Sequence, residues 1–204
     1  LKVLVCDRCY LVQIDEYKKS VEIFNEGYAY FSSVSRTWVE HARLYAGMIT
    51  EKLYLGKASF IVEVASNDGY LLQFFQQKGI SCLGVEPTHS TAAVAKLKGI
   101  EVIEKFFGLE LAEEVANKRG LADLIVGNNV LSHVPDCHDF VSGLSRLLKR
   151  TGTITLEFPH LLNLIRQTQF DTIYHEHFSY FSLAAVCKLC SMHDLDVYDV
   201  EKLP

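Results

Sequence analysis

The chain has 204 residues, of which 49% are hydrophobic and 22% are charged, and its formal net charge is -5 at pH 7. This composition is typical of one globular α/β domain with a short appendage and excludes a disordered chain. The negative balance gives no basic surface for nucleic acid, and no apolar run is long enough to cross a membrane. Residues 1–9 do not resemble a signal peptide, so we expect a cytoplasmic enzyme. We also expect it to be a monomer.

A pair of cysteines stands in the first predicted turn. Residues 1–14 have the pattern of two short strands around Cys6-Asp7-Arg8-Cys9. Two thiols at this spacing supply half of the four ligands that structural zinc requires. Nothing before Cys6 supplies two more, so we expect a half site at Cys6 and Cys9, in a remnant of a zinc-ribbon-like domain and its connector over residues 1–34.

The second pair, Cys187 and Cys190, has the same spacing in different surroundings. It falls in an apolar helical pattern over residues 183–192, where both cysteines are expected to pack as small hydrophobic residues. A four-cysteine zinc site is the less favoured alternative. In a cytosolic protein of this size we expect all the cysteines to be reduced.

Strand and helix patterns alternate from residue 59 onward, after an amphipathic helix over residues 35–55. Repeated βα units require a parallel sheet with helices on both faces. We therefore expect a Rossmann-like, doubly wound, mostly parallel α/β sheet in residues 35–204, with its C-terminal part cut short. The expected strands are 60–65, 81–86, 101–106, 123–127, 153–158 and 195–202, and the expected helices are 70–78, 90–97, 109–119, 137–148 and 183–192.

The loop after the first of these strands indicates the cofactor. Ser66, Asn67, Asp68 and Gly69 form a polar turn between an apolar strand that contains Glu63 and a predicted helix. The turn lacks the G-x-G-x-x-G pattern that lets the backbone approach a pyrophosphate, and acidic side chains are unfavourable beside phosphate. They suit S-adenosylmethionine, which carries a sulfonium and an ammonium group.

Polar residues also end the following strands. Glu86 lies about 20 residues past the turn, where a carboxylate accepts ribose hydroxyls. Nicotinamide enzymes use the same position, so a nicotinamide oxidoreductase stays an alternative, as does a solvated strand end. Asn128 ends the fourth strand and is expected to contact the amino-acid part of the cofactor, with His133 facing the reacting centre.

Titratable and hydroxyl groups gather in residues 169–181, which include Tyr174, His175, Glu176 and His177. His-x-His can chelate a metal, but spacing fixes no third ligand and the segment is not the H-E-x-x-H motif. Core or solvated histidines are a second alternative. Acid–base catalysis is favoured, because methylation of carbon requires proton removal beside a carbonyl and stabilisation of the enolate. Glu176 then binds hydroxyls or orients a histidine, and Tyr28 and Tyr174 donate to the oxyanion.

In these motifs the sequence resembles the S-adenosylmethionine-dependent C-methyltransferases that act on nucleotide-linked deoxy-keto sugars. The similarity covers nearly the whole chain, and its last motif is long and unusual. The matching stretches are residues 6–13, 28–33, 63–72, 84–87, 128–135, 157–160 and 170–177.

The resemblance implies a class I methyltransferase fold, a nucleotide-sugar substrate and a role for each matched residue. His177 would be the base at the sugar carbon, and Glu176 would hold sugar hydroxyls. Tyr174, Tyr28 and His133 would bind the keto sugar and stabilise the enolate. The cofactor would be bound by Glu63, Ser66, Asn67, Gly69, Glu86 and Asn128.

Two departures from the family's pattern affect function. The family has a further cysteine pair that completes a zinc site, and a C-terminal domain that helps to hold the nucleotide; neither is in this sequence. Zinc is therefore expected only where that pair is present. An O- or N-methyltransferase of another small molecule, and a cofactor-binding module without activity, stay as alternatives.

Overall fold

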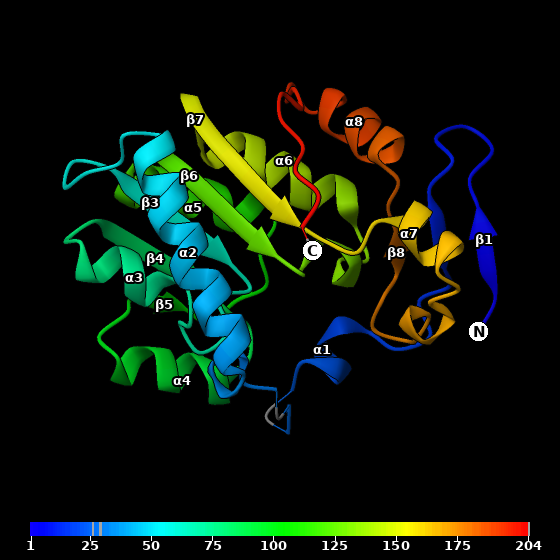
Figure 1. Ribbon diagram of the computed structural model, residues 1–204, viewed down its shortest axis with the longest axis horizontal. Helices are drawn as coiled ribbons and strands as arrows, with labels where there is room; N and C mark the ends of the chain where they lie inside the picture. Colours follow the sequence, from blue (N-terminus) through cyan, green and yellow to red (C-terminus); the bar gives the residue numbers. More distant parts are fainter. Residues whose placement is uncertain (26, 29, 204) are drawn as a thin grey trace.

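Parallel strands form the central sheet of the structure, a computed structural model that describes residues 1–25, 27–28 and 30–203. Within these residues the sheet has five strands (Figure 1). Their order across the sheet is β5 (Val102–Ile103), β4 (Ser81–Val85), β3 (Phe60–Val64), β6 (Ala122–Asn128) and β7 (Leu148–Glu157). The doubly wound α/β fold expected from the sequence is confirmed.

The strand β3 lies at the centre because its residues suit a strand covered on both faces. All five residues of Phe60–Val64 are buried, and four of them are apolar. The chain winds from β3 outward to β5 and then crosses back to β6, so the winding direction reverses between β3 and β6. In open α/β sheets, ligands bind at the carboxyl ends of the strands beside such a reversal.

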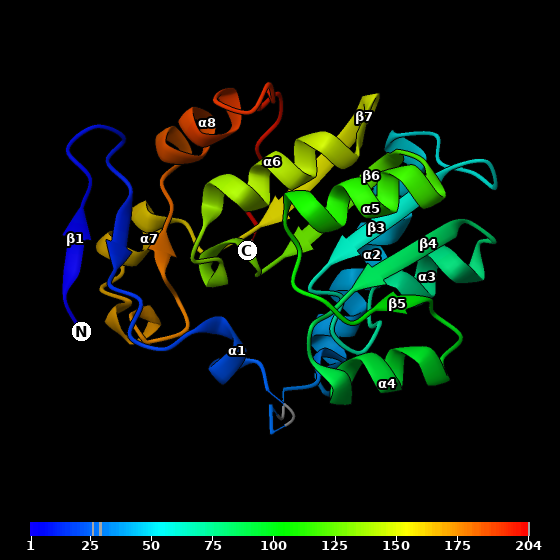
Figure 2. The same cartoon turned by 180° about the vertical axis from the view of Figure 1, so that it is seen from behind.

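Helices cover both faces of the sheet. One face packs against α2 (Arg36–Lys52), α3 (Leu72–Gln77) and α4 (His89–Leu97), as Figure 1 shows for α2. The opposite face, turned forward in Figure 2, packs against α5 (Leu109–Arg119) and α6 (Cys137–Leu147), and α8 (Leu183–Ser191) lies against α6. Among the described helices, none is long and apolar enough to span a bilayer.

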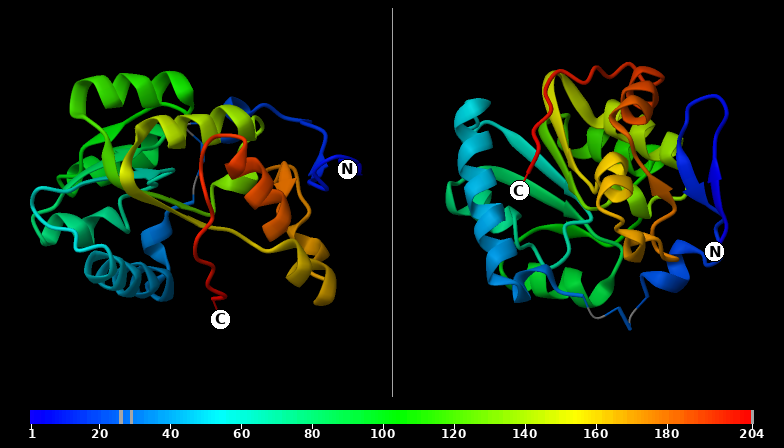
Figure 3. Two further views of the ribbon diagram at one scale, coloured as in Figure 1. Left: turned by 90° about the horizontal axis from the view of Figure 1, so that it is seen from above. Right: turned by 45° about the vertical axis from the view of Figure 1, so that its right-hand side comes forward.

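A second, small sheet joins the two ends of the chain. The predicted N-terminal hairpin is present as β1 (Val3–Val5) and β2 (Val12–Ile14), and β2 also pairs antiparallel with β8 (Ser179–Tyr180). Figure 3 shows the blue and orange segments side by side, beyond the edge of the central sheet. Between β7 and α8 the chain forms β8 and also the short helix α7 (Leu161–Arg166), and α1 (Ser20–Ile23) follows the hairpin.

The predicted strand at residues 195–202 is wrong. The structure has no strand in the described tail, which leaves α8 and crosses the front of the molecule (red in Figure 1). Side chains hold it instead: the Tyr198 hydroxyl lies 2.9 Å from Thr153 Oγ1, and Lys52 Nζ lies 2.6 Å from Asp199 Oδ2. Alternating apolar residues are not sufficient for a strand when the backbone has no neighbouring strand to pair with.

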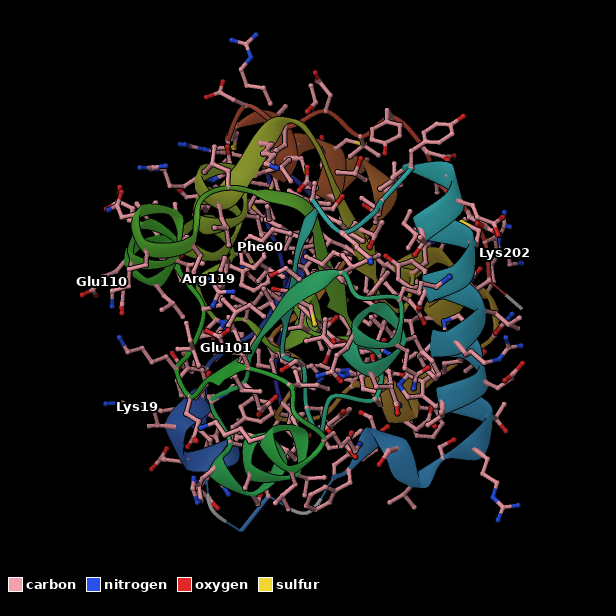
Figure 4. All side chains as sticks on the ribbon, turned by 90° about the vertical axis from the view of Figure 1, so that its left-hand side faces the viewer. Lys19, Phe60, Glu101, Glu110, Arg119 and Lys202 are labelled. Atoms are coloured by element: carbon pink, nitrogen blue, oxygen red, sulfur yellow. The ribbon has the colours of Figure 1, made fainter. Side chains whose placement is uncertain are left out.

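The amino ends of the strands are closed by packing and ion pairs. Arg119, the last residue of α5, holds its guanidinium 5.5 Å from the Phe60 ring and hydrogen-bonds Glu101 (Figure 4). Asp123 accepts a 2.7 Å bond from the Phe60 amide and binds Lys149 Nζ at 2.8 Å. These contacts leave the carboxyl ends as the open side of the sheet.

Candidate functional site

A cavity of about 830 Å³ opens at the carboxyl ends of β3, β4 and β6. This volume is within the range of small-molecule sites. Three parts of the chain far apart in sequence form its wall: the strand ends, the segment before α2, and the loop before β8. The expected site residues that line it are Tyr28, Asn67, Glu86, Asn128, His133, Tyr174, Glu176 and His177.

The two loops that begin the cavity wall have unusual backbone geometry. Ala65, Asn67 and Asn129 have φ of 57°, 49° and 51°, in the left-handed region that side chains other than glycine rarely adopt. All three line the cavity. Left-handed backbone at non-glycine residues is energetically costly and is concentrated at functional sites. Its presence in these two loops therefore indicates a functional site at this edge of the sheet.

Gly69 and Ser66 shape the first loop from beneath and do not line the cavity. Gly69 has a φ of +74°, and a Cβ there would lie 2.3 Å from Ile100 Cδ1. Ser66 is fully buried, with its hydroxyl where a Cβ on Gly84 would be. Both residues therefore let the loop fold tightly between β4 and α4.

Glu63 also lies under the loop rather than in the cavity wall. It is 1% exposed, and neither carboxyl oxygen has a hydrogen-bond partner among the described residues. Burial, followed by the negative charges of Glu86 and Asp68, raises the pKa of Glu63 well above its usual value. Its carboxyl group therefore lies beneath the loop and does not face the cavity.

Glu86 is held in place by two backbone amides. Its Oε2 accepts from the Asn67 amide and its Oε1 from the Thr88 amide, both at 2.9 Å. The side chain is 4% exposed but lines the cavity. Each carboxylate oxygen has a second lone pair, so Glu86 is a fixed acceptor suited to two neighbouring hydroxyls.

Hydrogen bonds attach the segment before α2 to the loop after β3. Asn67 accepts from the Ser32 amide at 2.9 Å through Oδ1 and donates to the Tyr30 carbonyl at 3.1 Å through Nδ2. Asp68 is fully buried, hydrogen-bonds Ser33 and lies 3.5 Å from Lys98 Nζ. The charge of Asp68 is thus met by Lys98 and does not reach the cavity.

Aromatic side chains outside the predicted site complete the wall. Trp38 stacks on Tyr70 with ring centroids 6.0 Å apart. Phe24 sits between Tyr28 at 5.1 Å and His133 at 5.8 Å, and also meets Phe106. Their spacing in sequence shows no common period. The dense aromatic run near Tyr28 was the one available signal.

Two histidines meet at the other side of the cavity. The rings of His133 and His177 have centroids 4.7 Å apart and planes at 75°. Burial, and next the proximity of His177, lowers the pKa of His133 to about 4. Burial also lowers the pKa of His177, against the opposing effect of the Thr172 carbonyl. Both imidazoles are therefore neutral near pH 7.

The hydrogen bonds of His177 determine its tautomer. Nδ1 lies 2.9 Å from the carbonyl oxygen of Thr172, which can only accept, so Nδ1 carries the proton. Nε2 then has the free lone pair, and it lies 3.0 Å from the Tyr174 hydroxyl, which donates to it. Nε2 of His177 is the basic atom, and it points at a phenol in the cavity wall.

The phenols of this side stay protonated. Burial, and next the charge of Glu176, raises the pKa of both Tyr28 and Tyr174 above the usual value. Each hydroxyl is thus a donor at neutral pH. His175 is turned the other way, with its ring 5.4 Å from that of Tyr17.

The described residues do not form a metal site. No cluster of three or more His, Cys, Asp or Glu side chains occurs among them, so the His-x-His segment and the cysteines lack the ligands that zinc requires. Cys6 and Cys9 are free thiols at the hairpin turn, and backbone amides of Cys9 and Arg8 lower the pKa of Cys6. Cys190 is buried as expected, whereas Cys187 is exposed on the outer side of α8, which corrects the expectation for that residue.

Sequence comparison places these features in a family. Residues 38–200 match the family described as a methyltransferase domain. The C-methyltransferase NovU from Streptomyces niveus is 38% identical over 200 residues, which are 98% of this chain and 47% of that protein. The chain therefore spans about half the length of this relative.

Solved structures share the fold. A SAM-dependent methyltransferase from Archaeoglobus fulgidus superposes with a TM-score of 0.60 at 14% identity, over 74% of this chain and 68% of that one. The magnesium protoporphyrin IX methyltransferase from Synechocystis, solved with bound SAH, gives 0.55 at 17% identity, over 85% and 80%. At such identities the likeness concerns the fold alone.

Proposed function

The chain belongs to the methyltransferase-domain family, and we propose that it transfers the methyl group of S-adenosylmethionine to a carbon next to the ketone of a nucleotide-linked deoxy sugar. One observation carries the proposal: an acid–base cluster, His133, Tyr174, Glu176 and His177, lines the same cavity as Glu86. The similarity to a C-methyltransferase supports carbon as the acceptor atom. A carbon next to a ketone becomes nucleophilic only when a base removes its proton, and this cluster supplies such a base.

The strand-end side of the cavity fits the cofactor. Glu86, with both oxygens fixed by backbone amides, would accept the ribose hydroxyls. Asn128 has a buried amide nitrogen without a partner among the described residues, and it would donate to the cofactor's carboxylate. Asn67 would contact the cofactor, while Ser66 and Gly69 would shape the loop from below and Glu63 would stay buried beneath it. When bound, S-adenosylmethionine supplies an electrophilic methyl group on sulfur.

The histidine side would perform the proton chemistry. Nε2 of His177 takes the proton of the carbon next to the ketone, and the electron pair of that C–H bond moves to the ketone oxygen. The enolate carbon would then be the nucleophile for the methyl group, which the bound cofactor would supply while the electron pair of its S–C bond stays on sulfur. The ketone is restored, and the proton passes from His177 to water.

The other side chains would orient the sugar and stabilise the enolate oxygen. Tyr174 donates to His177 Nε2 at 3.0 Å, and turning this hydroxyl to the ketone oxygen frees the lone pair as the substrate binds. Tyr28, kept protonated by burial and by Glu176, is a second donor. Glu176 would accept from sugar hydroxyls, and neutral His133 would bind beside them.

Calorimetric titration with S-adenosylhomocysteine and with NAD tests the cofactor. We expect binding of S-adenosylhomocysteine alone. Glu86→Gln replaces an acceptor by a donor facing a backbone amide and should weaken binding by about tenfold or more. Glu104→Gln, which changes a carboxylate on the outer surface beside Lys96, is the matched control and should bind like the wild type. Binding of NAD in preference would refute the proposal.

Proton exchange tests the acceptor. In heavy water, without methyl donor, the protein should exchange the hydrogen beside the ketone of a nucleotide-linked keto sugar. His177→Asn should abolish exchange and methyl transfer while keeping affinity for S-adenosylhomocysteine. Methylation that proceeds at wild-type rate in His177→Asn would remove this residue as the base, and a product methylated on oxygen or nitrogen would refute carbon as the acceptor.

A further inference from the structure

The N-terminal hairpin, residues 3–14, has almost no core of its own. Its two strands pair with each other, and the Cys6 amide closes the turn on the Leu11 carbonyl at 2.9 Å. Val3 and Val5 are 43% and 62% exposed. Ile14 is its buried apolar residue, at 6% exposure, and it packs with Leu164 and Tyr180. The hairpin is held to the rest of the molecule through β2, with further contacts from Leu11 to the main core and from Lys188 Nζ to the Arg8 carbonyl at 2.7 Å.

The partner of β2 is the segment that directly follows His177. Val12 and Gln13 pair with Tyr180 and Ser179 of β8, and the Ile14 amide donates to the Phe178 carbonyl at 3.0 Å. From the other side, the Phe178 amide donates to the Ser132 carbonyl at 2.7 Å. Phe178 is thus a bridge, one residue after His177, between the hairpin and the loop that carries His133.

We propose that the hairpin is a positioning element for His177, with Ile14 as its main contact. This inference rests on the proposed role of His177. The loop has anchors of its own, since Phe178 and Phe181 are 3% and 1% exposed in the core. Loss of the hairpin contact therefore leaves the loop attached to the core but loosens the backbone at Phe178. His177, one residue earlier, is then less firmly held, both in its Nδ1 hydrogen bond to the Thr172 carbonyl and in the direction of Nε2.

Ile14→Ala tests the proposal, because it removes buried contact and keeps the backbone amide. Val5→Ala, an exposed apolar truncation in the same hairpin, is the matched control. We expect amide hydrogen exchange at Phe178, Ser179 and Tyr180 to become about tenfold faster or more in Ile14→Ala and to stay unchanged in Val5→Ala. The affinity for S-adenosylhomocysteine should stay within about twofold of the wild type, because no cofactor-side contact changes.

Two readouts separate positioning from mere stability. In the NMR spectrum, the Nδ1–H signal of His177 should weaken or shift in Ile14→Ala at temperatures where the protein is fully folded. The kcat for methyl transfer should fall about tenfold with the KM for the cofactor unchanged.

The outcomes are distinguishable from failure of the proposed function. Unchanged exchange at residues 178–180, or an unchanged His177 signal, overturns the positioning role whatever the activity. Faster exchange with unchanged kcat overturns it as well. If the wild type methylates no keto sugar, the proposed function fails, and exchange together with the His177 signal still decides whether the hairpin positions the loop.

Discussion

The imidazole of His133 lies edge-on to that of His177, with ring centroids 4.7 Å apart. Two buried imidazoles at this distance cannot both carry a proton charge. Burial lowers the pKa of both imidazoles, and the proximity of His177 lowers that of His133 further, to about 4. The pair therefore keeps a free lone pair on Nε2 of His177 at neutral pH, as a base requires.

Acid should destabilise the protein through His133. Its pKa is about 4 in the folded state against a usual 6.5, so between these values the unfolded chain binds a proton that the folded chain does not. Stability is complete above pH 6.5 and falls towards pH 4, by about 1–3 kcal/mol from this residue. His133→Phe should flatten the dependence of the free energy of unfolding on pH, measured by urea denaturation. Equal slopes in variant and wild type would contradict this, and exposed His89→Phe is the control.

Gly69 and Gly79 form a matched pair for testing the loop after β3. Both have positive φ, +74° and +71°, but a Cβ at 69 meets Ile100 at 2.3 Å, whereas one at 79 meets only Lys57 at 3.7 Å. Gly79→Ala should cost about 1 kcal/mol of stability and Gly69→Ala about 2–4 kcal/mol. Thermal denaturation checks this, and equal losses would show that the close packing of residue 69 against Ile100 is unimportant.

Tyr174→Phe should slow methyl transfer by about a hundredfold, because it removes the donor to His177 Nε2 and, under the proposed mechanism, the donor to the enolate oxygen. Affinity for S-adenosylhomocysteine should not change. Tyr17→Phe, on a 75% exposed side chain beside His175, should react like the wild type. A Tyr174→Phe variant with normal kcat would exclude the phenol from the chemistry.

Phe24→Ala should raise the pKa of His133. The Phe24 ring packs 5.8 Å from the His133 ring, and its removal admits water to an imidazole whose pKa is lowered mainly by burial. An NMR titration should then place the pKa of His133 between about 4 and its usual 6.5. Phe170→Ala, at a 76% exposed ring, is the control. An unmoved titration would show that other groups exclude the water.

The central sheet was predictable because each strand and helix has the period of its own structure. The buried Phe60–Val64 and the amphipathic Arg36–Lys52, capped by Ser35, need no distant partner to be recognised. The pairing of β2 with β8 was not predictable from the sequence. The strand β8 has two residues, too few to show a pattern, and its partner lies more than 160 residues away. The tail at 195–202 failed for the converse reason, a strand-like pattern without a neighbouring strand.

The polar part of the candidate site was predictable from topology. Glu86 and Asn128 end parallel strands, and the carboxyl ends of such strands share one edge. Which side chain faces the cavity depends on the geometry of the loop. Ala65 and Asn67 have left-handed backbone here, and the Asn67 side chain lines the cavity, whereas Glu63 lies beneath the loop. The tautomer of His177 depends on the Thr172 carbonyl, a backbone group that the sequence does not distinguish.

The buried carboxyl group of Glu63 makes the fold less stable than an apolar residue at the same position would. A carboxyl group that is 1% exposed and has no partner among the described residues destabilises the native state relative to an apolar side chain of similar size. A sequence selected only for thermal stability would carry leucine or methionine at this position. Redesign of the core for heat resistance is therefore expected to replace Glu63, and the affinity of the resulting variant for S-adenosylhomocysteine would show whether the carboxyl group serves the site.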